Sequence, residues 1–479
     1  MSENLQSEIF TIGVGGAAGE GVKRAGIGVG NLLRDMGLEV YLSLEYPSLI
    51  RGGHNFVRLS GSKEKIWNDY SKLDILIALN EETVEIYKNE MKEGTVVLSG
   101  MPVDEMMEKL KGVLKERNFE LNKEENKSEL IDGNTAFAQG LMAAGLDFYI
   151  AYPMTPATSI LHYLASKQTK EGLKVIQPEN EISVINMALG MAYAGKRVAV
   201  GSATGGFALM QEAFSFAGMA ELPLVVAVSQ RQAPATGSPT HSSQSDLRFV
   251  IHAGHGEFPR IVLAPGDPTE SFKAGAEALN LAWKFQVPVI VLLDKILSEH
   301  MMTSDIERLK EGKIERFEEE RIFPGTLGVV VKTTSYEHDE EGYTIDKPEE
   351  IKKRVDKRFE KAKNIETEMQ NRETIKVYGE ENENVIVFFS STKGPVLEAS
   401  KYFNKPVKLV QIVWLEPFDT EKIKKELENK KVICIEGNHN AQLASLIREK
   451  TGIVCESILK YDATPFDPME LAEEINNRT

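Results

Sequence analysis

Six nearly continuous apolar runs lie between residues 132 and 297, and stretches with helical spacing separate them. Runs of this kind are typical of strands buried on both faces of a parallel sheet, because the covering helices remove both faces from water. The runs are DFYIAYP, LKVIQP, RVAVGSA, PLVVAVSQ, RIVLAP and VPVIVLLD. We therefore expect a doubly covered, mainly parallel sheet in the middle of the chain.

The same βα rhythm occurs on both sides of this segment. Apolar strands alternate with helical stretches such as 22–36 in the first hundred residues, and NVIVFFSS, VKLVQIVWL, KVICIEG and IVCESIL follow near the end. The expected fold is α/β with three α/β units. The predicted boundaries are 1–112 for the first domain, 113–130 for a charged linker with little to bury, 131–300 for the parallel-sheet domain, 301–380 for a charged, irregular connection with a helix near 348–366, and 381–479 for the last domain.

Charge and hydropathy narrow the function classes. A net charge of −16 opposes binding to nucleic acid or to an anionic membrane surface, since both need a positive footprint. No run approaches the roughly 20 apolar residues that span a bilayer, and the start MSENLQSE lacks the features of a signal peptide. We expect a cytoplasmic protein.

Two cysteines, Cys434 and Cys455, cannot ligate a cubane cluster alone, and their apolar surroundings favour buried, inert thiols.

A glycine-rich segment, GVGGAAGEG at 13–21, follows a strand and precedes a helix. That is where a phosphate-binding turn of a dinucleotide enzyme would lie, with Glu39 or Glu45 as the acid for a ribose. The spacing meets the dinucleotide pattern only with Ala18 in the last place. We favour the alternative, a tight turn that lets strand and helix pack closely.

Three strand ends carry the candidate chemistry. After the first strand of the central unit, YPMTPAT places Thr155 to cap a helix and Pro156 at its first position, so that a positive helix end faces the sheet edge. After the second strand, Asn180 can cap a helix that begins with Glu181; Glu179 is a neighbouring acid, and either acid could simply serve the helix dipole. Arg231 follows the fourth strand, where it is a solvated charge or a clamp for a carboxylate.

Histidines show no spacing typical of metal ligands. His241 lies in a polar loop, and His252 and His255 are separated by Ala and Gly. We expect no metal site made by this chain alone.

Together these segments resemble the α subunit of 2-oxoacid:ferredoxin oxidoreductases, in the form with a γ-type domain fused in front. YPMTPAT is similar to the family's Tyr-Pro-Ile-Thr-Pro signature, QPENEISVINMALGMAYAGKR to its cofactor-activating helix, GSATGGFALMQE to its glycine-rich segment and SQRQAPATGSPT to its arginine loop. Met154, Gln232 and Ala233 depart from the usual residues. SYEHDEEG with DKRFEKAK, and NHNAQLASLIREKTG with KYDATPF, resemble the later parts of the family, including a transketolase C-terminal-like domain; GVGGAAGEGV and EYPSLIRGGHNFVRLS resemble the γ-type domain.

The resemblance implies a thiamine diphosphate site shared with a partner, in which the 131–300 unit binds the aminopyrimidine ring. Glu181 matches the activating glutamate, with Glu179 as fallback; its carboxyl group would favour the ring's imino form, which then removes the thiazolium C2 proton. Thr155 and Arg231 match the positions that hold the keto acid. The implied catalytic residues are Glu181, Thr155 and Arg231; the implied cofactor-binding residues are Tyr152, Pro153, Thr155, Glu181, Thr204, Gly205 and Gly206.

The same resemblance implies the remaining components. There is no Gly-Asp-Gly element to carry Mg²⁺ and diphosphate and no cysteine-rich cluster motif in the sequence, so Mg²⁺ and a [4Fe-4S] cluster would belong to a β subunit. Coenzyme A would be the co-substrate, ferredoxin the electron acceptor and an (αβ)2 hetero-oligomer the assembly. Two alternatives stay open: a stand-alone flavin or nicotinamide enzyme built on the glycine-rich segment, and a non-catalytic scaffold subunit.

Overall fold

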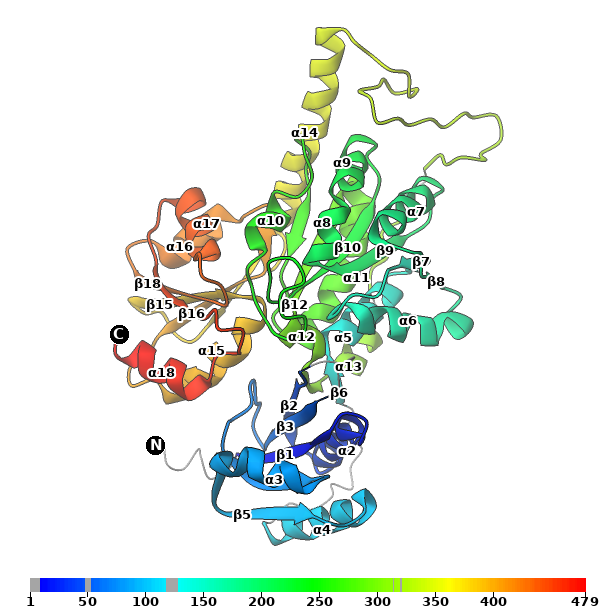
Figure 1. Cartoon of the computed structure of the whole chain (residues 1–479). Coiled ribbons are helices and arrows are strands. Elements are labelled where there is room, and N and C mark those ends of the chain that lie inside the picture. Colours follow the sequence, from blue (N-terminus) through cyan, green and yellow to red (C-terminus); the bar gives the residue numbers. More distant parts are fainter. Residues whose placement is uncertain (1–8, 48–52, 118–127, 313, 319–320) are drawn as a thin grey trace.

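The computed structural model describes residues 9–47, 53–117, 128–312, 314–318 and 321–479, which form three sheets covered by helices (Figure 1). The predicted α/β fold of three units is confirmed. The start MSENLQSE, residues 48–52 of EYPSLIRGGHNFVRLS and residues 118–127 of the predicted linker lie outside the described residues. Within the described part of the chain, no helix is both long enough and apolar enough to cross a bilayer.

The first sheet is mixed and has the strand order β5-β4-β1-β3-β2-β13-β6. Its first five strands are β1 (Phe10–Ala17), β2 (Glu39–Glu45), β3 (His54–Ser62), β4 (Leu73–Ala78) and β5 (Met91–Ser99). The helices of this unit are α2 (Val22–Asp35), α3 (Glu81–Tyr87), the short η1 (Lys88–Glu90) and α4 (Val103–Glu116). The charged segment predicted at 113–130 begins inside α4, whose Met106, Leu110 and Leu114 recur every four residues and are buried in the core of this unit.

The glycines of the 13–21 segment serve close packing. Gly13, Gly15 and Gly16 lie inside β1, where a Cβ atom would come within 2.5 Å of Phe56, 2.5 Å of Thr83 and 2.7 Å of Glu20 respectively. The carboxylate of Glu20 accepts hydrogen bonds from the Ala17 amide (2.7 Å) and from Asn80 Nδ2 (2.8 Å). A carboxylate of the chain therefore occupies the turn that a phosphate would need, which favours the packing interpretation.

The second sheet has the order β17-β11-β12-β10-β9-β7-β8 and is parallel except at β17. Its strands are β7 (Phe148–Ile150), β8 (Lys174–Ile176), β9 (Val198–Ala203), β10 (Leu224–Gln230), β11 (Ile261–Leu263), β12 (Pro288–Asp294) and β17 (Trp414–Glu416). The helices are α5 (Gly133–Ala143), α6 (Thr158–Glu171), α7 (Glu181–Tyr193), α8 (Thr204–Leu209), α9 (Gln211–Met219), α10 (Leu247–Ile251), α11 (Pro268–Phe285) and α12 (Lys295–Glu299). Every residue of β9, β10 and β12 is buried, as the continuous apolar runs predicted.

The third sheet has the order β14-β16-β15-β18-β19. It consists of β14 (Ile375–Tyr378), β15 (Asn384–Phe389), β16 (Lys408–Ile412), β18 (Lys431–Glu436) and β19 (Glu456–Leu459), with η2 (Ser390–Thr392), α15 (Lys393–Ala399), η3 (Ser400–Tyr402), α16 (Thr420–Leu427), α17 (Gln442–Thr451) and α18 (Pro468–Asn476). The run VKLVQIVWL is therefore not one strand. Its end, β17, crosses to the second sheet because the Val413 carbonyl accepts a hydrogen bond from the Ala264 amide (2.7 Å).

The segment that connects the second and third sheets contains more regular structure than the charged, irregular connection predicted for 301–380. Its start forms β13 (Met301–Ser304), which pairs antiparallel with β2 and with β6 (Glu129–Asp132) and so completes the first sheet. Two helices follow, α13 (Ile306–Glu311) and α14 (Pro348–Gln370), and the second contains the helix expected near 348–366. Residues 321–347, before α14, project from the body beside that helix (Figure 1). The domain boundaries themselves remain a prediction.

Candidate active site

Four candidate segments lie at one edge of the second sheet. Thr155, Glu181, Thr204 and Arg231 follow β7, β8, β9 and β10, in that order. These four strands are neighbours and parallel, so that their carboxyl ends meet at the same edge. Such an edge is where open α/β sheets bind their ligands.

Arg231 and Thr155 are in direct contact. Arg231 Nη1 donates a hydrogen bond to the Thr155 carbonyl oxygen at 2.8 Å, and both residues are half-buried. Burial lowers the pKa of Arg231 from its usual value, since the guanidinium loses part of its hydration. The guanidinium has five N–H donors, so it keeps capacity for a ligand carboxylate beside the Thr155 turn.

The predicted helix cap at Thr155 is wrong. Helix α6 begins at Thr158, and its N-cap, Ala157, makes no side-chain capping bond. The carbonyl of an N-cap residue accepts the first bond of its helix, whereas the Thr155 carbonyl accepts from Arg231 and the Pro156 carbonyl from Asn134 Nδ2 (2.8 Å). Tertiary hydrogen bonds thus hold 155–157 as a turn in front of the helix.

Glu181 is the first residue of α7 and only 3% exposed. Asn180 caps the helix as predicted, and its side chain accepts from the Ser183 amide at 2.9 Å. The Oε1 atom of Glu181 is buried and has no hydrogen-bond partner among the described residues. A buried carboxylate oxygen without a donor is unfavourable, and a donor from another molecule would remove that cost.

Glu179, the fallback acid, is in a different environment. It is exposed, and its carboxylate accepts a hydrogen bond from Ser183 Oγ, which lowers its pKa. The carboxylate is thus in water at the start of the helix, where it complements the helix dipole. Of the two acids, only Glu181 has the buried and unsatisfied environment of a cofactor-binding group.

Gly206 creates the space around the Glu181 carboxylate. A Cβ atom at Gly206 would lie 2.7 Å from Glu181 Oε1 and 2.1 Å from Ser202 Oγ, closer than any real contact. Glycine at this position in α8 therefore permits the placement of Glu181. Thr204, at the start of α8, donates through Oγ1 to Asp246 Oδ2 at 2.8 Å, and burial raises the pKa of Asp246.

Exposed apolar side chains lie on the segments that follow β7, β8 and β9 at this sheet edge. Tyr152, Ile182, Met187 and Leu209 are all exposed, with exposed fractions of 53% for Ile182 and 55% for Leu209. Pro153 is half-buried and Gly205 is exposed. The candidate site thus combines a buried acid with exposed apolar side chains on neighbouring segments.

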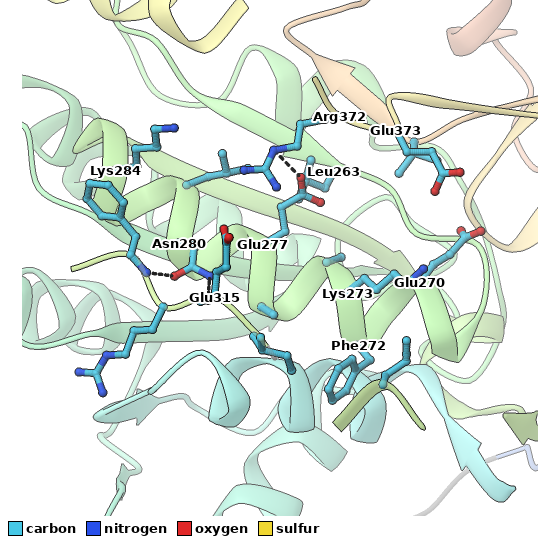
Figure 2. A pocket seen from close by; sticks show the side chains of 18 of the residues that line it. Leu263, Glu270, Phe272, Lys273, Glu277, Asn280, Lys284, Glu315, Arg372 and Glu373 are labelled. Atoms are coloured by element: carbon cyan, nitrogen blue, oxygen red, sulfur yellow. Dashed lines mark hydrogen bonds and ion pairs between the residues drawn. The ribbon is translucent and has the colours of Figure 1, made fainter. Parts of the chain in front are cut away.

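Two cavities lie away from this acid. One of about 780 Å³ lies between α11, residues 314–318 after α13 and residues 371–376 after α14, where charged side chains pair with one another (Figure 2). Arg372 Nε lies 3.8 Å from Glu277 Oε1, and Lys376 Nζ lies 3.1 Å from Glu270 Oε1. The other, of about 610 Å³, lies between the first and third units and is bordered by 240–242, which continue the Arg231 loop and include His241.

No group of three or more histidine, cysteine or acidic side chains has a metal-binding arrangement in the part of the chain that the structure describes. Cys434 is buried as expected, and burial raises its pKa well above the usual value; Cys455 is half-buried, and burial raises its pKa to about 12. Neither thiol is poised as a thiolate at neutral pH.

Asn134 and Asp246 contact the site residues but were not singled out by the sequence. Asn134 is fully buried at the start of α5 and holds the Thr155 turn, and Asp246 binds Thr204. Neither stands at a strand end of the central sheet, so strand-end position could not have identified them.

Comparison with known proteins covers nearly the whole chain. A family model described as pyruvate flavodoxin/ferredoxin oxidoreductase, thiamine diphosphate-binding, matches residues 139–371, and one described as pyruvate ferredoxin/flavodoxin oxidoreductase matches residues 11–143. The α subunit of a Sulfolobus 2-oxoacid:ferredoxin oxidoreductase is 29% identical over 96% of each chain. A 2-oxoglutarate synthase subunit KorA from Methanocaldococcus jannaschii is 32% identical over 65% of this chain and 89% of its own.

A solved structure agrees with the sequence relatives. The 2-oxoglutarate:ferredoxin oxidoreductase from Magnetococcus marinus, with 2-oxoglutarate, coenzyme A and succinyl-CoA bound, superposes with a TM-score of 0.86. It is 27% identical to this chain and covers 98% of it and 99% of its own length.

Proposed function

Because this chain belongs to the family of 2-oxoacid:ferredoxin oxidoreductase α subunits with a fused γ-type domain, we propose that it supplies the half-site that activates thiamine diphosphate. The enzyme of this family converts a 2-oxoacid and coenzyme A to acyl-CoA and CO₂ and passes the electrons to ferredoxin. The observation that carries the proposal is the buried, unpartnered Oε1 atom of Glu181 at the carboxyl edge of the second sheet.

The residues present fit the aminopyrimidine end of the cofactor. Glu181 offers a buried acceptor, Gly206 leaves it free of a neighbouring Cβ, and the exposed apolar side chains of Tyr152 and Leu209 suit a flat ring. When bound, thiamine diphosphate supplies the nucleophilic carbon and the electron sink that loss of CO₂ requires. Pro153, Thr204 and Gly205 complete the proposed contacts.

Glu181 holds a proton at the ring atom N1′, and its burial excludes water that would compete for that hydrogen bond. Arg231 pairs with the carboxylate of the 2-oxoacid, because its guanidinium lies at the Thr155 turn in a partly desolvated position. Thr155 orients the keto end of the substrate. These three residues are the proposed catalytic residues.

A β subunit completes the enzyme in this proposal. It carries Mg²⁺, the diphosphate-binding half and a [4Fe-4S] cluster, and it assembles with this chain as an (αβ)2 hetero-oligomer that reduces ferredoxin. Coenzyme A accepts the acyl group. Purification of the complex followed by iron, sulfide and thiamine analysis tests this composition: a complex without thiamine or without iron would contradict it.

The test of the reaction is Glu181→Gln in the assembled complex. The amide keeps the size of the side chain but removes the acid, and general acid-base steps contribute about 10² to 10⁴ in rate. We expect 2-oxoacid oxidation to fall by a few orders of magnitude while the complex stays assembled. Glu179→Gln is the matched control, because that exposed acid should leave the rate unchanged. An unchanged rate in Glu181→Gln would instead favour a non-catalytic scaffold subunit.

Arg231→Ala separates substrate binding from cofactor activation. Hydrogen bonds to charged groups contribute about 1.5–3 kcal/mol, so the KM for the 2-oxoacid should rise about tenfold or more. Bound thiamine diphosphate should stay unchanged. If the substitution prevented assembly and left the KM unaltered in the remaining complex, Arg231 would be a structural residue.

A further inference from the structure

The segment 322–347, called the arm from here on, carries apolar side chains that this chain leaves uncovered. It contains no helix or strand and extends beside α14 away from the three sheets (Figure 1). Leu327 is 99% exposed and Val330 91% exposed, and Ile322, Tyr336 and Tyr343 are exposed as well. Single exposed apolar residues are ordinary, but a cluster on a projecting segment indicates a surface that another molecule covers.

The arm is held in a defined shape. Arg358 of α14 donates two hydrogen bonds to the Glu337 carboxylate, at 2.6 and 2.8 Å, in a partly buried pair. Asp339 Oδ1 accepts from the amides of Glu341 (3.0 Å) and Tyr343 (2.8 Å) and closes a turn. A surface fixed in advance binds at a lower entropic cost than a disordered tail.

The arm contacts the end of the helix that carries Glu181. Tyr193 at the end of α7 donates its hydroxyl to the Val331 carbonyl at 2.7 Å. Between Glu181 and Tyr193 the outer face of α7 exposes Ile182, Asn186, Met187 and Gly190, which are apolar or small except for Asn186. The exposed face of α7 therefore connects the candidate site to the arm.

We propose that the arm closes over the partner subunit that carries the diphosphate-binding half of the site, with Leu327 and Val330 as its apolar contacts. This rests on the proposed function, because that function places the partner against Glu181. A partner seated there covers the face of α7, and the arm contacts α7 where that face ends. The arm thus extends the interface that α7 forms with this partner.

The test uses the purified complex of this chain with its thiamine-diphosphate-binding partner. The double variant Leu327→Asp with Val330→Asp places two charges on the contact, and the dissociation constant of the complex should rise about tenfold or more. Val454→Asp is the control, since Val454 is also an exposed valine but lies in the third unit, far along the chain from the arm. An unchanged dissociation constant in the double variant overturns the proposal.

Sedimentation of this chain alone tests whether a second copy of the chain, and not the partner subunit, covers the arm. If wild-type chains self-associate and the double variant abolishes that association while partner binding is unchanged, a second copy covers the arm and the proposal is wrong.

Amide hydrogen exchange gives a measurement that does not depend on the variant. Exchange at 326–331 should slow when the partner binds, and equal exchange in the free and bound chain overturns the proposal. If the arm variant loses partner binding but Glu181→Gln keeps a normal rate, the proposed mechanism is wrong. The proposed contact between the arm and the partner is then still supported.

Discussion

Asn134 fixes the turn on which the candidate substrate site depends. Its Nδ2 atom donates to the Pro156 carbonyl and to Ser159 Oγ, both at 2.8 Å, so both amide hydrogens are used inside a fully buried environment. The next carbonyl towards the N-terminus, that of Thr155, accepts the hydrogen bond from Arg231. A shift of this turn would therefore move the Arg231 guanidinium and the Thr155 side chain together.

Asn134→Asp should weaken 2-oxoacid binding through that turn. The substitution keeps the size of the side chain but points an acceptor at the Pro156 carbonyl, and an unsatisfied buried group costs about 1–3 kcal/mol. The KM for the 2-oxoacid should rise more than kcat falls, as measured by steady-state kinetics of the complex. Ser159→Ala is the control, because it leaves the bond to Pro156 in place. A uniform loss of bound thiamine diphosphate would instead indicate general unfolding of the site.

Local sequence predicted which residues come to the sheet edge but not how they are held. Thr155, Glu181 and Arg231 follow neighbouring parallel strands, and parallel strands bring their carboxyl ends together. The cap at Asn180 followed from residue type as well. The Asn134 contact and the clearance at Gly206 join residues more than twenty positions apart, so no local pattern contains them.

The start of helix α7 fixes where the Glu181 side chain lies. Asn180 ends the extended segment after β8 and accepts from the Ser183 amide, which fixes the first turn and with it the Glu181 side chain. Two further buried residues, Val184 and Ile185, anchor the same turn to the core. The direction of the acid therefore depends on the start of the helix.

Asn180→Ala should loosen this start. Loss of an N-cap costs about 1 kcal/mol, so the urea midpoint of this unit should fall slightly. The rate of 2-oxoacid oxidation should fall further than this small loss of stability suggests, because the Glu181 side chain loses its fixed direction. Asn180→Ser, which can cap a helix, should restore both quantities. A rate that tracks stability alone across the two variants would contradict a positioning role for the cap.

At the element scale, the strands inside each sheet were predictable and the strands that cross between sheets were not. Period and composition identify β9, β10 and β12, since every residue is buried and all are apolar or small except Gln230 and Asp294 at the strand ends. The same signals cannot show that Trp414–Glu416 leaves the third sheet for β11, or that Met301–Ser304 joins β2. Such pairings depend on partners about 150 and 260 residues away, which the apolar pattern does not specify.

Across the whole molecule, the second and third sheets share one core and one buried ion cluster. Val226 and Ile290 of the second sheet belong to the same apolar core as Val387 and Val410 of the third. Beside it, Lys393 of α15 forms ion pairs with Asp267 and Glu270 at the start of α11, and Gln411 Nε2 donates to Glu270 at 2.6 Å. These contacts fix the third unit against the sheet that carries the site.

Lys393→Met tests how strongly this cluster holds the two units together. Removal of one partner of a buried ion pair leaves an uncompensated charge and costs about 3–5 kcal/mol. The variant should unfold at lower urea concentration, with the third unit exchanging its amide hydrogens first. Lys352→Met is the control, because Lys352 forms an exposed pair with Asp356.

The loss of stability in Lys393→Met should depend on pH because of Asp267. Burial alone would raise the pKa of Asp267, but Lys393 outweighs it and holds the pKa below its usual value. In the wild-type chain this stabilisation is therefore present above the pKa of the unfolded chain and is lost as the pH falls. Without Lys393, burial dominates and the pKa rises, so the protonated carboxyl stabilises the fold at low pH and that contribution is lost as the pH rises. The difference in urea midpoint between Lys393→Met and wild type should accordingly be larger at pH 7 than near pH 4. A difference that stays constant over this range would mean that the charge of Asp267 does not link the two units.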